Sequence, residues 1–186
     1  MQYLAEGMEK YLTTLKDALD RLNRQEVLVF LSLLLKAREE GRQIFIMGNG
    51  GSAATASHFV CDFNKGLSKP GQKRFKFICL NDNVPSMMAY GNDISYDDIF
   101  VEQLRNFVQP EDVVIGISGS GNSMNVVKAV TYANEQGAKT ACLVGYDGGR
   151  LKQIAEQCVH VDVNNMQIVE DIHMILDHMG MTVLSA

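Results

Sequence analysis

Short apolar segments recur after the first forty residues, and each is followed by glycine-rich or polar residues. Runs of this length, bounded by turn residues, are typical of strands buried on both faces of a sheet. The pattern predicts strands at residues 44–47, 75–80, 113–117, 140–144 and 159–163. Helical spacing of apolar positions predicts one helix that begins near residue 52. It predicts four more at residues 97–107, 124–136, 149–157 and 166–184. Residues 81–98 are expected to form loops and short helical turns.

Strands that alternate with helices predict an α/β fold, with a parallel sheet covered on both faces. If the five strands take the flavodoxin-like order 2-1-3-4-5, the first and third strands are neighbours. The topological switch point then lies between them, at the place where such sheets bind ligands. The loops that follow these two strands should therefore line one crevice.

Two further helices are predicted before the first strand. Residues 2–22 have an amphipathic spacing, and residues 25–40 lead to Gly41, a natural residue to follow a helix end. The centre of the second helix, residues 27–35, is apolar almost all round, which implies burial on several sides. A subunit interface would provide this burial, and deep packing within one chain is the alternative.

The first strand runs into a glycine-rich loop. Gly48, Gly50 and Gly51 allow a close backbone approach to a ligand, and Ser52 can cap the next helix. The free N–H groups at such a helix start favour phosphate. The loop lacks the third glycine of G-x-G-x-x-G, and no Gly-Lys-Ser/Thr follows it, so we expect a phosphate and no nucleotide cofactor.

The third strand runs into a loop with three serines and two glycines, Ser118 to Ser123. Serine hydroxyls and glycine N–H groups both donate to phosphate oxygens. A flexible linker could have this composition, but a linker does not lie between a buried strand and a helix. Candidate ligands of a phosphorylated molecule are therefore Gly50, Gly51, Ser52, Ser118, Ser120, Asn122 and Ser123.

The 186 residues are expected to form a single domain, 46% hydrophobic and 21% charged, with a helical segment (1–40) and an α/β core (41–186). A formal net charge of −5 gives no overall attraction to nucleic acid or an anionic membrane. Because no signal peptide is visible and the longest apolar run is about half of a membrane span, we expect a cytoplasmic protein.

The four cysteines lack C-x-x-C spacing and are expected to be reduced core residues: Cys61, Cys79, Cys142 and Cys158.

Two helices carry candidate chemistry. His58 and Asp62, four residues apart, share a helix face and could act as acid and base or as metal ligands, although such a pair can also merely stabilise a helix. The last predicted helix carries Glu170, Asp171, His173, Asp177 and His178. At about 100° per residue, Asp171 projects within about 20° of His178, whereas Glu170 is about 80° away. Periodicity alone therefore selects Asp171 as the partner of His178.

The motifs resemble those of the SIS (sugar isomerase) domain family, and within it the sedoheptulose 7-phosphate isomerases, also called phosphoheptose isomerases. They are GNGGSAATASHF from Gly48, GND from Gly91, ISGSGNS from Ile117, GYDGG from Gly145 and Glu-x-x-His-x-x-x-x-His from Glu170. The resemblance implies a three-layer α/β/α sandwich with a five-stranded parallel sheet. It also implies a homotetramer with active sites at subunit interfaces.

The same resemblance implies roles for individual residues. Serines at 52, 118, 120 and 123 would hold the sugar phosphate, and Asn49 and Asp93 would contact the sugar. Asp62 and His178 would move protons between C1 and C2 through an enediol. Some family members bind zinc at the positions of His58, Asp62, Glu170 and His178.

The chain departs from the family pattern at two site positions. Asp62 replaces a glutamate, and Glu170 replaces a glutamine, which adds a carboxylate to the site and strengthens the case for a divalent metal. Residues 63–67 also lack the usual Thr-Gly-Arg run.

Three functions are compatible with these residues. The first is a phosphosugar aldose-ketose isomerase. The second is a non-catalytic binding protein, like the related DnaA initiator-associating proteins, which share GYDGG. The third is cysteine-nucleophile chemistry at Cys61 with His58, which rests on spacing alone. The combination of His58, Asp62 and His178 favours the isomerase.

Overall fold

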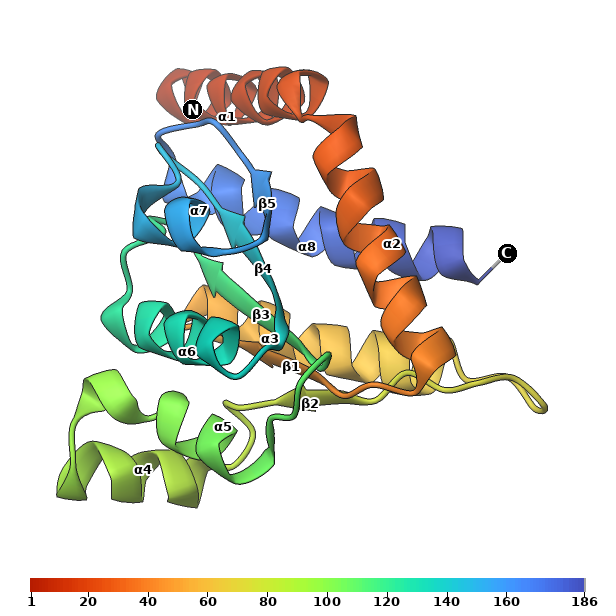
Figure 1. Cartoon of the computed structure of the whole chain (residues 1–186). Helices are drawn as coiled ribbons and strands as arrows, with labels where there is room; N and C mark the ends of the chain where they lie inside the picture. Colours follow the sequence, from red (N-terminus) through yellow and green to blue (C-terminus); the bar gives the residue numbers. More distant parts are fainter. Residues whose placement is uncertain (186) are drawn as a thin grey trace.

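The computed structural model describes residues 1–185 and contains one five-stranded parallel sheet (Figure 1). Its strands are β1 (Ile44–Met47), β2 (Phe77–Cys79), β3 (Val113–Ser118), β4 (Lys139–Val144) and β5 (Gln157–His160). Their spatial order is β2-β1-β3-β4-β5, and every neighbouring pair is parallel. The predicted order is confirmed, so β1 and β3 lie side by side at the centre.

Helices cover both faces of the sheet and give three layers. Alternate residues of β1 face opposite ways: Ile44 and Ile46 pack with α2 (Arg24–Glu40), α3 (Gly51–Cys61) and α8 (Met166–Leu184). Phe45 and Met47 pack on the other side with α5 (Val101–Phe107), α6 (Met124–Glu135) and α7 (Gly149–Ile154). The four residues of β1 are completely buried, which explains their continuous apolar run.

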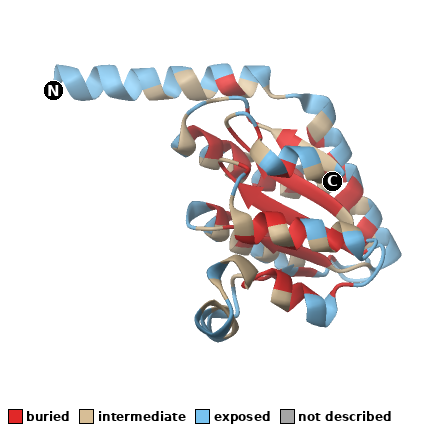
Figure 2. Cartoon of the chain, turned by 60° about the vertical axis from the view of Figure 1, so that its left-hand side comes forward, coloured by how far each residue is buried: buried red, intermediate tan, exposed pale blue. Residues whose placement is uncertain are grey.

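The first helix, α1 (Gln2–Arg21), extends beyond the body of the molecule, and blue marks most of its length as exposed in Figure 2. Only its second half packs on the rest of the chain, where Ala18 contacts the cluster formed by Ile168 and Ile172 of α8. The helix α2 ends at Gly41 in the left-handed conformation, as predicted. Two of its apolar side chains are nevertheless exposed, Leu28 by 57% and Val29 by 39%.

Several sequence predictions are corrected by the structure. Residues 84–93 form the helix α4 (Val84–Asp93), because the Asn83 side chain accepts a hydrogen bond from the Ser86 N–H and Pro85 fits the first turn. The helix after β4 ends at Ile154, since residues 157–160 pair with β4 as β5. A 3₁₀ turn (Tyr96–Asp98) replaces the start of the helix expected at 97, and β2 is shorter than expected.

Two smaller predictions are also wrong. The cap of α3 is Gly50, so Ser52 lies inside the first turn and does not cap the helix. All four cysteines are free thiols, but Cys61 is exposed and not part of the core. Across residues 1–185, the helices are too short or too polar to span a bilayer.

Candidate functional site

Both predicted loops meet at the carboxyl edge of the sheet. A cavity of about 270 Å³ opens between them and the start of α8. It is lined by Asn49, Gly50, Gly51, Ser52, Ile117, Ser118, Gly119, Ser120, Ser123, Met166 and Glu170. The order of the strands places the ends of β1 and β3 together, so two segments some seventy residues apart in the sequence share one crevice.

The serine loop after β3 is held by the loop after β4. The Gly145 N–H donates to the Gly119 carbonyl (2.8 Å), and the Leu151 N–H donates to the Gly121 carbonyl (2.9 Å). Gly121 has a φ of 66°, and a Cβ there would collide with the carbonyl of Gly148. These contacts fix the backbone, while the hydroxyls of Ser118 and Ser123 lie 3.0 Å apart at the crevice.

An amide pair joins the loop after β1 to the start of α6. Asn49 and Asn125 exchange two hydrogen bonds of 2.9 Å, and Tyr96 donates to Asn49 Oδ1 at 2.9 Å. Asn125 is 1% exposed and was not predicted as a site residue from the sequence. Its signal was a polar residue in the first turn of a helix whose next two positions, Val126 and Val127, are buried. It orients Asn49, which lines the cavity.

Two predicted substrate ligands do not line the cavity. Asp93 is exposed at the end of α4 and accepts a hydrogen bond from Asn92 (2.8 Å). Asn122 instead closes its own loop: its side chain donates to the Ser120 carbonyl and accepts from the Arg150 N–H.

The cavity contains one charged lining residue, Glu170, and none of its lining residues carries a positive charge. The Glu170 carboxylate lies so close to Gly51 that a Cβ there would overlap it. A bound phosphate would therefore depend on serine hydroxyls, loop N–H groups and the starts of α3 and α6.

A second set of polar groups lies farther along α3 and α8. Ligand atoms of His58, Asp62, Asp177 and His178 all lie within 4.8 Å of one another, so the four residues could hold a metal ion. The Nε2 atom of His58 lies 3.1 Å from Nε2 of His178, 3.6 Å from Asp62 Oδ2 and 3.7 Å from Asp177 Oδ2. A π-helical turn (Asp62–Gly66) begins at Asp62, and such turns often occur at functional sites.

Three of the four predicted metal ligands, His58, Asp62 and His178, belong to this cluster. The fourth predicted ligand, Glu170, does not, and Asp177 takes its place. Glu170 lies seven residues before Asp177, or about 10 Å along α8. Asp171, the partner that periodicity selected for His178, accepts a hydrogen bond from Tyr11 of α1 instead, which raises the pKa of Tyr11 to about 12. His173 is buried, and burial lowers its pKa to about 4.

Asp177 is completely buried, and neither of its carboxylate oxygens has a hydrogen-bond partner among residues 1–185. Burial raises the pKa of Asp177 to about 7, and the negative charge of Asp62 contributes to the rise. The geometry of the cluster fits a cation, because two ligands of a tetrahedral zinc at about 2.0–2.1 Å lie roughly 3.4 Å apart. The separations of 3.1, 3.6 and 3.7 Å around His58 Nε2 are close to this value.

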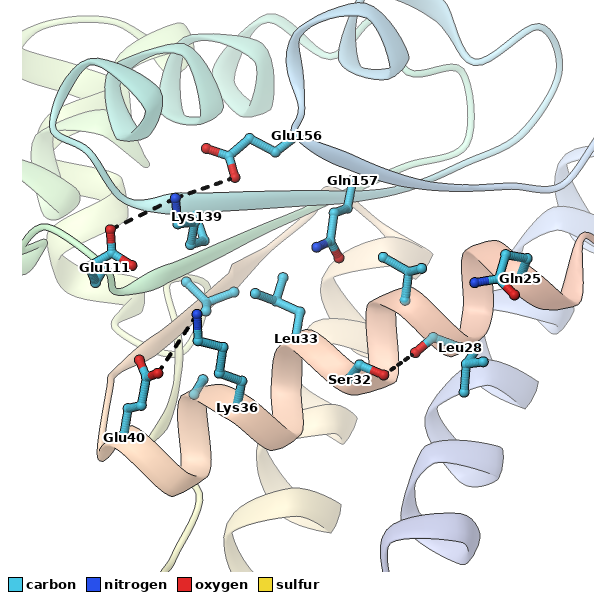
Figure 3. Close-up of a pocket in the computed structure, with 13 residues that line it drawn as sticks. Gln25, Leu28, Ser32, Leu33, Lys36, Glu40, Glu111, Lys139, Glu156 and Gln157 are labelled. Atoms are coloured by element: carbon cyan, nitrogen blue, oxygen red, sulfur yellow. Dashed lines mark hydrogen bonds and ion pairs between the residues drawn. The ribbon is translucent and has the colours of Figure 1, made fainter.

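A larger cavity of about 470 Å³ lies between α2 and the amino ends of β3, β4 and β5 (Figure 3). Its rim carries ion pairs of Lys139 with Glu111 (3.8 Å) and with Glu156 (3.9 Å), and apolar side chains of α2 form its floor. Ligands of open α/β sheets bind at the carboxyl ends of the strands. We therefore assign the functional site to the loops at that edge.

Comparisons with known proteins identify the family of the chain. A family model described as the SIS domain matches residues 8–145. A probable phosphoheptose isomerase from Thermoplasma acidophilum is 36% identical over 178 residues, which cover 96% of this chain and 93% of the relative. A phosphoheptose isomerase from Helicobacter pylori is 35% identical over 173 residues, which cover 93% of this chain and 85% of the relative.

The fold also has a solved counterpart. The structure of phosphoheptose isomerase GmhA from Neisseria gonorrhoeae matches with a TM-score of 0.88 at 26% identity, over 98% of this chain and 97% of that chain. The family model covers both phosphate-binding candidate loops, and the relatives align over nearly the whole length. The chain therefore belongs to the SIS domain family.

Proposed function

We propose that this protein is a phosphosugar aldose-ketose isomerase that resembles sedoheptulose 7-phosphate isomerase. The observation that carries the proposal is the placement of two chemically different sites along the same pair of helices. On α3, the crevice residue Gly51 precedes His58 by seven residues, and on α8 Glu170 precedes Asp177 by seven. Seven residues correspond to about 10 Å. An extended phosphorylated sugar would reach from the serine loops to the acidic and imidazole groups.

The crevice would hold the phosphate end. Ser52, Ser118 and Ser120 would donate hydroxyl hydrogen bonds to the phosphate, and the N–H groups of Gly50 and Gly51, at the start of α3, would point at it. Asn49, fixed by Asn125, would orient a sugar hydroxyl. With no cationic group among its lining residues, the crevice would discriminate by shape and hydrogen bonding.

The cluster would perform the proton transfers. Asp62 would take a proton from the carbon next to the carbonyl, and His178 would transfer a proton between the two oxygens. The resulting enediol regains the proton on the neighbouring carbon, which exchanges aldose and ketose without an external oxidant. Asp62 is 18% exposed in its side chain and thus accessible to substrate.

The residues of the cluster also fit zinc, because two imidazole nitrogens and carboxylate oxygens form a ligand set that zinc prefers. His58, Asp62 and His178 would hold the ion. When bound, it would stabilise negative charge on the substrate oxygens.

A seven-carbon substrate is supported by the names of the relatives, which are phosphoheptose isomerases at 31–38% identity. The competing function is that of a non-catalytic phosphosugar-binding or DnaA initiator-associating protein. It is favoured by the shorter Asp62 at the position of the family's glutamate, because a base misplaced by about 1 Å can cost about a hundredfold in rate.

A thermal-shift panel tests the proposed binding. We expect ketose phosphates of six and seven carbons to raise Tm, and the unphosphorylated sugars to leave it unchanged. At about a hundredfold excess over Kd the stabilisation is about 2.7 kcal/mol, or roughly 5–10 °C for a domain of this size. A panel without any stabilisation, with and without added zinc, would favour the protein-binding role.

The assembly would be a homo-oligomer, with a tetramer as the family expectation. Exposed apolar side chains on α1 and α2, including Leu4, Met8 and Leu28, have no partner within residues 1–185 and would pack on a second copy. Light scattering after size exclusion should give a multiple of 20.6 kDa. Leu28→Glu should reduce the assembly, whereas Met88→Glu on α4 should not. A wild-type monomer at micromolar concentration would refute this assembly.

A further inference from the structure

Asp177 is a completely buried carboxylate on α8, in the cluster with His58, Asp62 and His178. Its side chain is 0% exposed, and both oxygens lack a hydrogen-bond donor among residues 1–185. Burial of an ionised carboxylate is strongly unfavourable unless it is paired or bound to a metal. Buried polar groups of this kind are usually satisfied in native folds by an ordered water or an ion. The surroundings of Asp177 decide which one.

The neighbours of Asp177 are also electron-pair donors. Its Oδ2 lies 3.7 Å from Nε2 of His58, which also lies 3.6 Å from Asp62 Oδ2 and 3.1 Å from Nε2 of His178. Two neutral imidazoles can share one N–H between their Nε2 atoms, and this leaves the two carboxylates without a donor. A water molecule could donate hydrogen bonds to only two of these four side chains, whereas a divalent cation could accept an electron pair from all four at once.

We propose that Asp177 is the fourth ligand of a divalent cation bound by His58, Asp62 and His178, in the place that the sequence motif gave to Glu170. This inference rests on the metal site of the proposed function but not on the isomerase reaction. Glu170 lies two helical turns away, against Gly51 in the phosphate crevice. Asp177 and Glu170 of α8 therefore serve different ends of the site: Asp177 binds the cation, and Glu170 contacts the ligand held by the loops.

The ligand set selects the metal. Two nitrogen and two carboxylate oxygen donors at these separations suit a small four-coordinate ion, and zinc prefers such a site over the all-oxygen shells of magnesium and calcium. We therefore expect tight binding of Zn²⁺ and of its spectroscopic substitute Co²⁺, and weak binding of Mg²⁺ and Ca²⁺.

Direct titration of the full chain with Zn²⁺, by calorimetry and by metal content after dialysis, tests the assignment. We expect one ion per chain in the wild type. Asp177→Asn keeps the volume of the side chain and removes its charge, so its affinity for Zn²⁺ should fall by more than about 100-fold, beyond the loss typical of a residue that only orients a ligand. Glu170→Gln is the matched control on the same helix and should retain the wild-type affinity.

Cobalt absorption adds a readout that a merely structural role would not change. The wild type and Glu170→Gln should give the intense visible bands of four-coordinate Co²⁺, and Asp177→Asn should weaken or shift them. Circular dichroism and the Tm of the metal-free variants confirm folding. If Glu170→Gln loses zinc and Asp177→Asn retains it, the assignment is overturned, as it is if the folded wild type binds no divalent ion. Stabilisation by sugar phosphates in metal-free buffer would still support the proposed function in either case.

Discussion

Asp62→Asn is expected to reduce turnover of sugar phosphate by about 10²- to 10⁴-fold, the range that a positioned general base contributes. The amide preserves the size of the side chain but cannot accept the proton from carbon. Ligand stabilisation in a thermal shift should persist, because Asp62 lies about three helical turns beyond Ser52, the last crevice residue of α3. Steady-state kinetics of the variant, with metal content measured in parallel, checks this result.

Two variants control the Asp62 experiment. Asp62→Glu keeps a carboxylate of the kind found in the family, so it should retain measurable turnover. Asp171→Asn removes a carboxylate that pairs with Tyr11 of α1 and lies outside the cluster, so turnover should stay at the wild-type level. Normal turnover by Asp62→Asn would exclude Asp62 as the base.

Gly121→Ala is expected to have the second large effect, on phosphate binding and on stability together. A residue with a side chain is strained at a φ of 66° by about 1–2 kcal/mol. The new Cβ would also collide with the backbone carbonyl of Gly148, and overpacking of this kind costs about 1–3 kcal/mol. The loop after β3 would shift, so Ser118 and Ser120 would lose their positions. Denaturant unfolding and the thermal shift with sugar phosphate measure both effects.

Gly71→Ala separates strain from collision. Gly71 has a φ of 78°, but a Cβ there meets no atom within 4 Å. This variant should lose only the stability that corresponds to the strained backbone, about 1–2 kcal/mol. It should bind sugar phosphate like the wild type. If Gly121→Ala and Gly71→Ala lost equal stability and equal affinity for sugar phosphate, the role assigned to the contact between the loops after β3 and β4 would be contradicted.

The sheet and the crevice between the loops after β1 and β3 were predictable because their signals are local. A run such as residues 44–47 is apolar without alternation only when both faces of the strand are covered, and the glycines and serines follow directly after the strands. The order of the strands then brings the two loops together. Asp93 and Asn122 were assigned by motif alone, and their side chains turn out to lie outside the cavity.

The partners of α8 could not be predicted from periodicity. A helical wheel gives the angle between two side chains, but the neighbours of a helix also change along its axis. Near its start α8 meets α1, so Asp171 pairs with Tyr11. Two turns later it meets α3, so Asp177 and His178 face His58. Only the three-dimensional packing identifies Asp177 as the buried carboxylate of the cluster, and the same holds for Asn125 at the start of α6.

Proton exchange in deuterated water tests the central claim most directly. The wild-type protein is incubated in D₂O with ketose phosphates of six and seven carbons, and proton NMR follows the hydrogens on C1. An enediol mechanism predicts that the protein catalyses the incorporation of solvent deuterium at C1 of at least one of these sugars, and that Asp62→Asn does not. A folded, ligand-stabilised wild-type protein that leaves every C1 hydrogen unexchanged and forms no aldose would contradict the isomerase assignment.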